Sequence, residues 1–384
     1  MKIAHVVMDF KPIVSGDGTV VYEISKYLSS CNYNVTIITF LPLNYLRYIK
    51  REEYIENIKI VRFPYFSTGL KLKLYDPIIK GFFSHLINNR YDIIHCHSFH
   101  YYYSLICVVY KIINPKCKLI LHMHHPWQYS HLYFLNNFYK TIRNMHTRFI
   151  LSSSDIIIAI TPHDIHGLKN LKLCTKNVVI IPNGINWLNY QKENILYLRK
   201  KYNIPLNNKI IFYLGMLAEN KGLLFLLKTF HEIVKKNTSI KLVISGRNAG
   251  MKSKLVNYIK EKKMENDVFI TGILTDEEKI YAFLDCDIFI LPSKYEGFGI
   301  VLIEAQAAGK PVIATKKGGI PYVVLDKETG FLIDYGNVNE LVKVIKKLVY
   351  DDDLRNFMGL KGREYAKNYD YMKLLPNLLK IYKK

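Results

Sequence analysis

The chain has 384 residues, of which 49% are hydrophobic and 13% aromatic, and its formal net charge at pH 7 is +22. This composition excludes a disordered or collagen-like chain and supplies enough apolar residues for two buried cores. The excess of Lys and Arg favours polyanionic partners such as nucleotide phosphates, an anionic membrane surface or nucleic acid, and a base composition biased toward A and T would explain much of it equally well.

The N-terminal sequence MKIAHVVMDF lacks the long apolar core of a signal peptide and is predicted to be a first strand. No apolar run reaches the length needed to span a membrane. The cysteines are scattered without a C-x-x-C pair, which favours free thiols in a reducing cytoplasm over disulfides or a zinc site: Cys31, Cys96, Cys107, Cys117, Cys174 and Cys286. We expect a cytoplasmic protein, peripheral on the inner face of the membrane.

Two series of apolar segments alternate with amphipathic segments, which predicts two doubly wound α/β domains. Near-continuous apolar runs such as DIIIAI are typical of parallel strands covered on both faces. In the first series we expect strands at Ile3–Met8, Val35–Thr39, Ile58–Arg62, Asp92–Cys96, Lys118–Met123, Asp155–Ile160 and Val178–Ile181. The second series has five strands, KIIFYLG, IKLVISG, DVFITG, CDIFILP and KPVIAT. The polar segment LNYQKENILYLRKKYNIPLNNK, residues 188–209, is predicted to be a linker.

Ligands of doubly wound domains bind at the carboxyl ends of the strands. After the first strand, SGDGTVVYEISKYL contains Gly16 and Gly18, and a helix is expected to begin near Thr19. A glycine loop that opens a helix directs free N–H groups and the positive end of the helix dipole toward an anion. The loop lacks the G-x-G-x-x-G spacing of a dinucleotide site, and an ordinary turn is the alternative.

Histidines gather at the ends of two expected strands, in IHCHS and LHMHH: His95, His97, His122, His124 and His125. A metal site is one interpretation. No carboxylate lies nearby in sequence, and the H-E-x-x-H helix pattern is absent, so no metal is predicted. We expect histidines that line a cleft and bond a substrate or its departing phosphate, with at least two being core histidines bonded to the backbone.

The second series carries lysine and glutamate at strand ends. In FYLGMLAENKG a helix is expected near Asn220, and Lys221 in its first turn can reach an anion held at the strand end. In EGFGIVLIEAQAAG, the glycines around Phe298 let the backbone approach oxygens closely, and a helix from Gly299 or Ile300 places Glu304 in its second turn. Because that helix is predicted to be buried, the carboxylate needs partners, either vicinal hydroxyls or a lysine.

The segments SGDG with its helix, GMLAENKG and EGFGIVLIEAQAAGKPVIATKKGGIPYVV…TGFLI resemble family 4 retaining glycosyltransferases of GT-B fold, and the last is close to the family's Glu-x7-Glu signature. The resemblance covers nearly the whole chain. It implies two Rossmann-like doubly wound parallel-sheet domains facing across a cleft. We expect an acceptor-side domain at 1–188, a nucleotide-sugar domain at 189–366, and a C-terminal helix at 367–384 that crosses back to the first domain.

The resemblance also implies site roles. The catalytic residues would be His124, which contacts the donor sugar near C1, Glu296, which faces that sugar near the reacting face, and Lys221, which binds the diphosphate. Glu304 would hold the ribose hydroxyls. The other implied donor contacts are the Gly16 loop at the diphosphate, the backbone near Ile273 at the base, the amides of Phe298 and Gly299 on sugar hydroxyls, and Gly215, Ile300 and Arg247.

The chain departs from the family pattern at two positions. Met216 stands where the family usually has an arginine that binds phosphate, and Arg247 stands where an acidic residue is more common. We hypothesise that Arg247 partly compensates for the missing arginine.

The implied activity is retaining, metal-independent transfer of a hexose from a nucleotide-diphosphate sugar such as a UDP- or GDP-hexose to an acceptor hydroxyl. No other cofactor is expected, since Lys221 and helix N-termini would neutralise the leaving diphosphate. The segment WQYSHLYFLNNFYKTIRNMHTRF mixes aromatic and basic residues, which suits a membrane interface and a lipid-linked acceptor; a core helix, and a glycan or protein acceptor, stay open. Alternatives are a nucleic-acid-binding or base-modifying protein, a sugar-nucleotide epimerase or hydrolase, and a non-catalytic relative.

Overall fold

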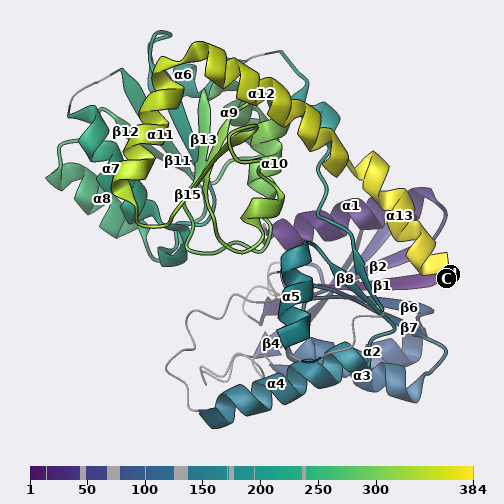
Figure 1. Ribbon diagram of the computed structural model, residues 1–384. Coiled ribbons are helices and arrows are strands. Elements are labelled where there is room, and N and C mark those ends of the chain that lie inside the picture. Colours follow the sequence, from purple (N-terminus) through teal and green to yellow (C-terminus); the bar gives the residue numbers. More distant parts are fainter. Residues whose placement is uncertain are drawn as a thin grey trace. The chain divides into compact units, whose positions relative to one another are not determined.

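The computed structural model describes residues 1–13, 15–43, 49–66, 78–99, 101–124, 137–170, 172, 177–193, 195–235 and 239–383. The chain divides into two units, shown in Figure 1: unit 1 comprises Met1–Asn183 with Leu374–Lys384, and unit 2 comprises Gly184–Lys373. The two units divide at residues 183 and 374, close to the expected domain boundaries at 188 and 367, and those domain boundaries stay a prediction.

Unit 1 is built on one mostly parallel sheet, which within the described residues has nine strands in the order β3-β4-β2-β1-β6-β7-β8-β9, with β5 paired to β4. Among the strands that the structure describes, only β3 and β5 run antiparallel to their neighbour β4. The strand order reverses between β1 and β6. The bounds are β1 (Lys2–Val6), β2 (Asn34–Pro42), β3 (Glu52–Ile55), β4 (Ile58–Phe66), β5 (Ile78–Ile79), β6 (Ile93–His97), β7 (Lys118–His122), β8 (Ile156–Ala159) and β9 (Val178–Ile180).

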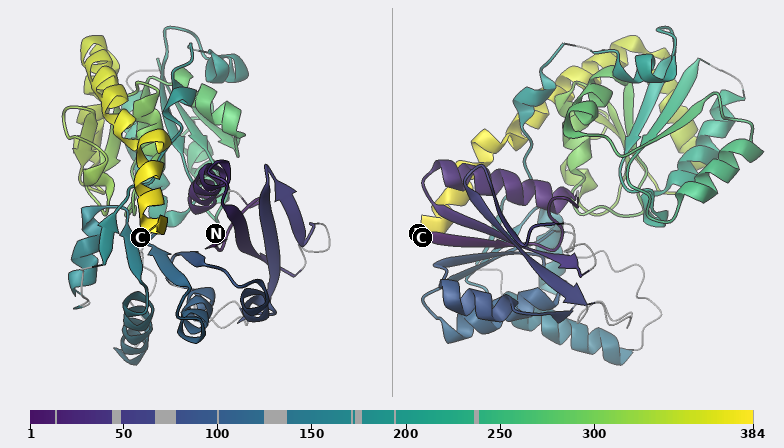
Figure 2. Two further views of the ribbon diagram at one scale, coloured as in Figure 1. Left: turned by 90° about the vertical axis from the view of Figure 1, so that its right-hand side faces the viewer. Right: turned by 180° about the vertical axis from the view of Figure 1, so that it is seen from behind.

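Helices cover both faces of this sheet. In Figures 1 and 2, α1 lies on one face, and α2, α3 and α4 lie on the other. Burial on both faces explains why the strand sequences are apolar almost without interruption, as in Val6, Ile94 and Leu121. The helices are α1 (Gly16–Ser30), α2 (Phe82–Asn89), α3 (Tyr102–Ile113), α4 (Asn137–Ser152), α5 (Pro162–Asn170) and α13 (Tyr371–Lys383), which belongs to unit 1 from Leu374 onward.

The described part of unit 2 contains a parallel sheet of six strands in the order β12-β11-β10-β13-β14-β15. The order reverses between β10 and β13, as in a doubly wound nucleotide-binding domain. Figure 1 shows α7, α8 and α11 on one side and α9 and α10 on the other. The strands are β10 (Lys209–Leu214), β11 (Ile240–Ser245), β12 (Val268–Gly272), β13 (Ile288–Leu291), β14 (Val312–Thr315) and β15 (Gly330–Ile333). The helices are α6 (Tyr197–Tyr202), α7 (Leu223–Val234), α8 (Lys252–Glu261), α9 (Asp276–Asp285), α10 (Ile300–Ala307), α11 (Val338–Tyr350) and α12 (Asp352–Ala366).

All twelve strands expected from the sequence are present, with ends that shift by up to four residues. Three strands were not predicted: β3, β5 and β15. Two of these lack the apolar run that indicates a buried strand, because β3 has the sequence EEYI and β5 has only two residues. The two parallel α/β sheets confirm the predicted fold class.

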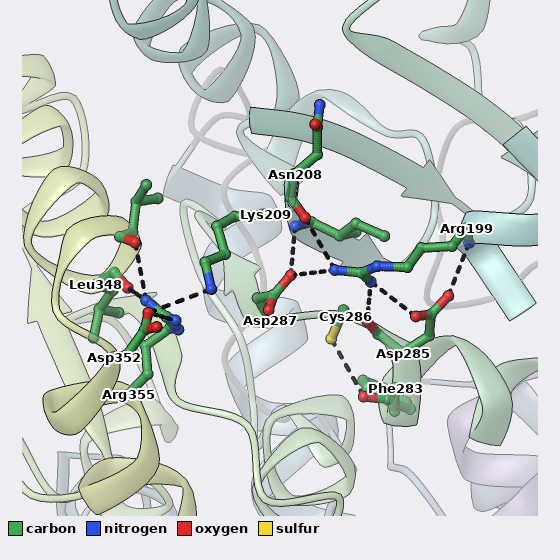
Figure 3. A network of polar contacts seen from close by, with 12 residues as sticks. Arg199, Asn208, Lys209, Phe283, Asp285, Cys286, Asp287, Leu348, Asp352 and Arg355 are labelled. Carbon is green, nitrogen blue, oxygen red and sulfur yellow. Dashed lines mark hydrogen bonds and ion pairs between the residues drawn. The ribbon is translucent and has the colours of Figure 1, made fainter. Parts of the chain in front are cut away.

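The prediction of a linker at residues 188–209 is wrong. This segment contains a 3-10 helix (Trp187–Tyr190) and α6, and Leu198 is fully buried. Figure 3 shows why the segment is polar: the buried Arg199 guanidinium donates to Asp285 at 2.8 Å and to Asp287 at 3.0 Å. Charged residues that pair inside a domain have the same composition as a solvated linker, so composition alone misleads here.

Candidate active site

The point where the strand order of unit 2 reverses brings two loops together. One follows β10 and the other follows β13, and the backbone N–H of Lys294 donates to the carbonyl of Asn220 at 2.8 Å. Gly222 has a φ of +70°, and a Cβ added to it would lie 2.0 Å from the carbonyl oxygen of Pro292. Only glycine permits this approach. The carboxyl ends of β10 and β13 therefore form one continuous rim, which is where ligands of such sheets bind.

Lys221 and Glu296 form an ion pair on this rim. Nζ of Lys221 lies 2.6 Å from Oε1 of Glu296, and the same oxygen accepts from Oγ of Ser293 at 2.7 Å. Both side chains are largely buried. Lys221 does not lie in the first turn of a helix as expected: it ends a 3-10 helix (Glu219–Lys221), and α7 begins only at Leu223. Its location is therefore fixed by Gly222 and by the ion pair, not by the helix.

Glu304 lies in the second turn of α10, as the sequence predicts. The helix begins at Ile300, and Gly299 caps it with a φ of +85°. The buried carboxylate accepts from the hydroxyl of Tyr190 and from Nζ of Lys279, both at 2.7 Å and both at Oε1. Of the two kinds of partner that the sequence left open, the lysine is present. Within the described residues the second carboxylate oxygen of Glu304, Oε2, carries no hydrogen bond. Burial, followed by the nearby charge of Glu304, raises the pKa of Tyr190 well above its ordinary value.

Both glutamates have partners that sequence reasoning missed. Ser293 lies three residues before Glu296, inside the motif itself. Tyr190 lies in the segment taken for a linker, and Lys279 lies on α9. Side chains that meet only through the fold leave no spacing pattern in the sequence, so only Ser293 could have been found from it.

Two of the predicted donor contacts flank the rim at the ends of β10 and β11. Gly215 donates its N–H to Ser245, and Met216 follows it with an exposed side chain. Nη2 of Arg247 lies 3.6 Å from the sulfur of Met216. The structure therefore brings Arg247 beside the position where the family arginine is missing.

Two further predicted contacts differ in exposure. Ile273, which follows β12, is 62% exposed, and its contact with a base stays a prediction. Phe298 is buried and packs edge to face on Tyr369 with ring centroids 5.8 Å apart. The Phe298 ring is therefore part of the core, and a contact with a ligand would come from its backbone.

In unit 1, Gly16 is the first residue of α1, so the helix begins three residues before the expected Thr19. Ser15 is the N-cap: its Oγ accepts from the N–H of Gly18 at 2.9 Å and donates to the carbonyl of Asp9 at 3.1 Å. Asp17 lies in the first turn, where a carboxylate is stabilised by the helix dipole. The Gly16 loop is a helix N-terminus, as a phosphate site requires, and its contact with a diphosphate stays a prediction.

The histidines at the ends of β6 and β7 form a buried cluster, which His5 on β1 joins. His125 lies outside the described residues. Ring nitrogens of the cluster bond one another and Tyr382 instead of the backbone partners expected for core histidines: His5 to His97 and His97 to His124 at 2.9 Å each, and His95 to the Tyr382 hydroxyl. Burial lowers the pKa of His5 to about 3 and holds the pKa values of His95, His97 and His122 well below the ordinary range.

Two overlapping triads in this cluster have ring nitrogens within 4.8 Å of one another: His5, His95 and His97, and His97, His122 and His124. That spacing would admit a metal ion, whereas the sequence predicted none. The rings are stacked rather than splayed, with centroids of His95 and His97 and of His122 and His124 4.2 Å apart. The sequence could have flagged His5, because it interrupts the apolar strand KIAHV.

Two family models match the chain: "Glycosyltransferase Family 4" over residues 14–186 and "Glycosyl transferases group 1" over residues 195–365. The chain is 24% identical to N-acetyl-alpha-D-glucosaminyl L-malate synthase of Bacillus anthracis, over 92% of this chain and 89% of that one. It is 28% identical to an uncharacterized glycosyltransferase of Methanocaldococcus jannaschii over 61% of each chain, so it spans about three fifths of that relative.

Solved structures show the same fold. HepE from Anabaena in complex with UDP and glucose matches with a TM-score of 0.82 at 18% identity, over 100% of this chain and 99% of that one. The two family models, which together match residues of both units, and this likeness lead to one conclusion. The chain belongs to glycosyltransferase family 4 and has the GT-B fold.

Proposed function

We propose that this protein is a retaining, metal-independent glycosyltransferase that moves a hexose from a nucleotide-diphosphate sugar to an acceptor hydroxyl. The observation that carries the proposal is the rim of unit 2, where Glu296 with Lys221 and Glu304 with an available Oε2 lie at the carboxyl ends of the strands. Glu304 would hold the ribose hydroxyls and Glu296 the sugar hydroxyls. The amides of Phe298, Gly299 and Ile300 would contact the same sugar.

Lys221 suits the leaving group. Among the described residues its ammonium pairs with one carboxylate, at 2.6 Å, and a diphosphate with two negative charges would compete for it. That exchange would neutralise the diphosphate and release Glu296 for the sugar hydroxyls. Arg247 would add a second cation from the end of β11. Preorganised cations of this kind stabilise charge that develops on a leaving group without a metal.

The transfer would break the bond between C1 and the diphosphate oxygen and form a bond between C1 and the acceptor oxygen on the same face. The acceptor proton would pass to the departing phosphate. Same-face attack is what the family resemblance implies for this chain. His124 of unit 1 keeps its proposed role on the donor sugar near C1.

A thermal-shift screen with UDP-, GDP- and ADP-sugars tests the donor half of the proposal. UDP-glucose comes first, because solved relatives carry UDP and glucose. A donor at a hundred times its Kd stabilises a folded protein by about 2.7 kcal/mol. The shift should vanish in Glu304→Ala and persist in Glu364→Ala, which removes an exposed glutamate paired with Lys367.

The other outcomes distinguish the alternatives. An epimerised sugar nucleotide formed without an acceptor would indicate an epimerase. Retention of DNA on a filter with a steep salt dependence would indicate a nucleic-acid-binding protein. Absence of any shift with every sugar nucleotide would indicate a non-catalytic relative.

A membrane surface is the proposed site of the acceptor. On α3 the side chains of Ile112 and Ile113 are 58% and 57% exposed, and on the adjoining α4 Met145 and Phe149 are exposed beside Arg148. Exposed apolar residues next to basic ones suit an anionic lipid interface. None of the described helices combines the length and apolar character needed to cross a bilayer.

Co-sedimentation with vesicles tests this surface. The protein should bind vesicles that contain phosphatidylglycerol and bind pure phosphatidylcholine vesicles much more weakly, because the attraction is electrostatic and hydrophobic together. The double variant Ile112→Glu, Ile113→Glu should lose binding. The exposed Leu206→Glu variant of unit 2 is the control and should bind like the parent protein.

A further inference from the structure

Three of the buried histidines of unit 1 form a hydrogen-bonded chain. Nδ1 of His5 lies 2.9 Å from Nε2 of His97, and Nδ1 of His97 lies 2.9 Å from Nε2 of His124. Nδ1 of His124 then lies 3.7 Å from Oδ1 of Asp17 in the first turn of α1. The two hydrogen-bonded contacts have the same head-to-tail orientation, and the last ring faces the Asp17 carboxylate at a distance longer than a hydrogen bond.

The direction of the protons in this chain can be worked out. A neutral imidazole carries one N–H, so each 2.9 Å contact needs one donor and one acceptor. If every ring donates from Nδ1, His5 donates to His97, His97 donates to His124, and the N–H of His124 points toward Asp17. The nitrogen left over is Nε2 of His5, which then carries only a lone pair.

The opposite arrangement, in which each ring donates from Nε2, is energetically less favourable for two reasons. It would place a proton on Nε2 of His5, which is buried and has no hydrogen-bond partner among the described residues. It would also turn the lone pair of Nδ1 of His124 toward the Asp17 carboxylate. A buried unsatisfied N–H and a lone pair facing a negative charge are both unfavourable. A charged His97 donating in both directions is disfavoured, because the ring is buried among other imidazoles.

We propose that His97 and His5 are positioning residues for His124: they hold it as the tautomer with the proton on Nδ1 and fix the ring plane. The inference rests on the proposed role of His124 at the donor sugar. It gives that role a definite chemistry, because His124 would act as a neutral hydrogen-bond donor from Nδ1 and not as a base. The second ring nitrogen of a functional histidine commonly sets the tautomer in this way.

The hydrogen-bonded histidine chain explains the arrangement of the buried histidines better than a bound metal ion does. Both nitrogens of His97, which is common to the two triads, already take part in 2.9 Å contacts. The rings of His95 and His97 are stacked with centroids 4.2 Å apart, and so are those of His122 and His124. Lone pairs lie in the ring planes, so stacked rings direct them side by side rather than toward one ion.

Nitrogen NMR of the full chain with ¹⁵N-labelled histidine tests the proposal directly. The His124 signals are assigned by their loss in His124→Gln. At pH 7.5 the expected result is a proton on Nδ1 and none on Nε2. In His97→Leu the preference should be lost, whereas in His97→Asn the side-chain amide can replace Nδ1 as donor and should restore it.

Hydrolysis of UDP-glucose, or of whichever sugar nucleotide shifts the melting temperature, gives the second readout. We expect His97→Leu to lower kcat about ten- to a hundredfold with KM changed by less than about threefold, and His97→Asn to recover most of the loss. The matched control is His122→Phe. His122 is equally buried and stacks on His124, but neither of its ring nitrogens has a hydrogen-bond partner within the described residues. This variant should keep the parent kcat and the parent tautomer.

Three results would overturn the proposal: a proton on Nε2 of His124 in the parent protein, a tautomer unchanged in His97→Leu, or one equivalent of zinc in the purified protein that disappears in His97→Leu. The NMR result does not depend on a donor. If no sugar nucleotide is bound or hydrolysed, the proposed function fails while the tautomer measurement still decides whether the histidine chain exists.

Discussion

Lowering the pH from 7 to 5.5 should destabilise unit 1 because its buried histidines must be protonated on unfolding. Burial holds the pKa values of His5, His95, His97 and His122 far below the ordinary 6.5. Below pH 6.5 the unfolded state therefore binds more protons than the native state, and stability falls as the pH falls. Between pH 7 and pH 5.5 each such histidine lowers the free energy of unfolding by about 1.3 kcal/mol, and the four together lower it by about 5 kcal/mol.

Other titrating groups do not reverse this sign. The pKa values of His85, His146 and His163 in unit 1 are also lowered, chiefly by burial, and add to the same trend. Glu52 has a lowered carboxyl pKa, mainly through its bond to Lys59, and the stability from that group is lost only below about pH 4.5, outside the interval. The charged group that faces His124, the last ring of the histidine chain, is the Asp17 carboxylate on α1.

Urea unfolding at pH 7, 6.5, 6 and 5.5 measures the effect. With an m value of about 2 kcal/mol/M, a loss of about 5 kcal/mol lowers the midpoint by roughly 2.5 M. Far-UV circular dichroism follows both units. In a Trp127→Phe background the only tryptophan is Trp187 of unit 2, whose indole N–H donates to the carbonyl of Arg363, so its fluorescence follows unit 2.

We expect the midpoint of unit 1 to fall steeply with pH. The His122→Phe variant keeps three of the four most strongly shifted imidazoles, and because His85, His146 and His163 also contribute, the pH dependence should weaken by less than about a quarter. A midpoint that stays constant between pH 7 and 5.5 would show that the histidines are charged or solvated in the native state, and would refute the reasoning.

Three further substitutions test unit 2. Arg247→Ala should weaken donor affinity about tenfold with the melting temperature unchanged, because the side chain is exposed; unchanged affinity in a titration would remove the proposed compensation. Arg199→Leu should lower the free energy of unfolding by about 3–5 kcal/mol, because it leaves two aspartates without their cation, and a urea-measured loss below about 1 kcal/mol would contradict this. Gly222→Ala should lower the melting temperature much more than Gly336→Ala, since both have positive φ but only the first would clash with backbone; equal effects would show that φ alone matters.

Local sequence patterns were enough to predict twelve of the described strands and the motif at the rim. Buried parallel strands need apolar side chains on both faces, so runs such as KIIFYL and IKLVIS indicate them without any tertiary information. The start of α10 was predictable as well, because Gly299 adopts a positive φ that glycine favours and small apolar residues follow it. The place of Glu304 in the second turn of this helix therefore followed from the motif, whereas the roles of Glu296 and Glu304 stay predictions.

The partners of those residues depended on the fold. Tyr190 reaches Glu304 across 114 positions of sequence, and His5 reaches His97 across 92. Arg199 looked like part of a linker because its two aspartates are more than 80 residues away. A local pattern records the period and the turn chemistry of one element. Which polar groups satisfy one another inside a core is decided by strand order and helix packing, and only the tertiary structure sets those.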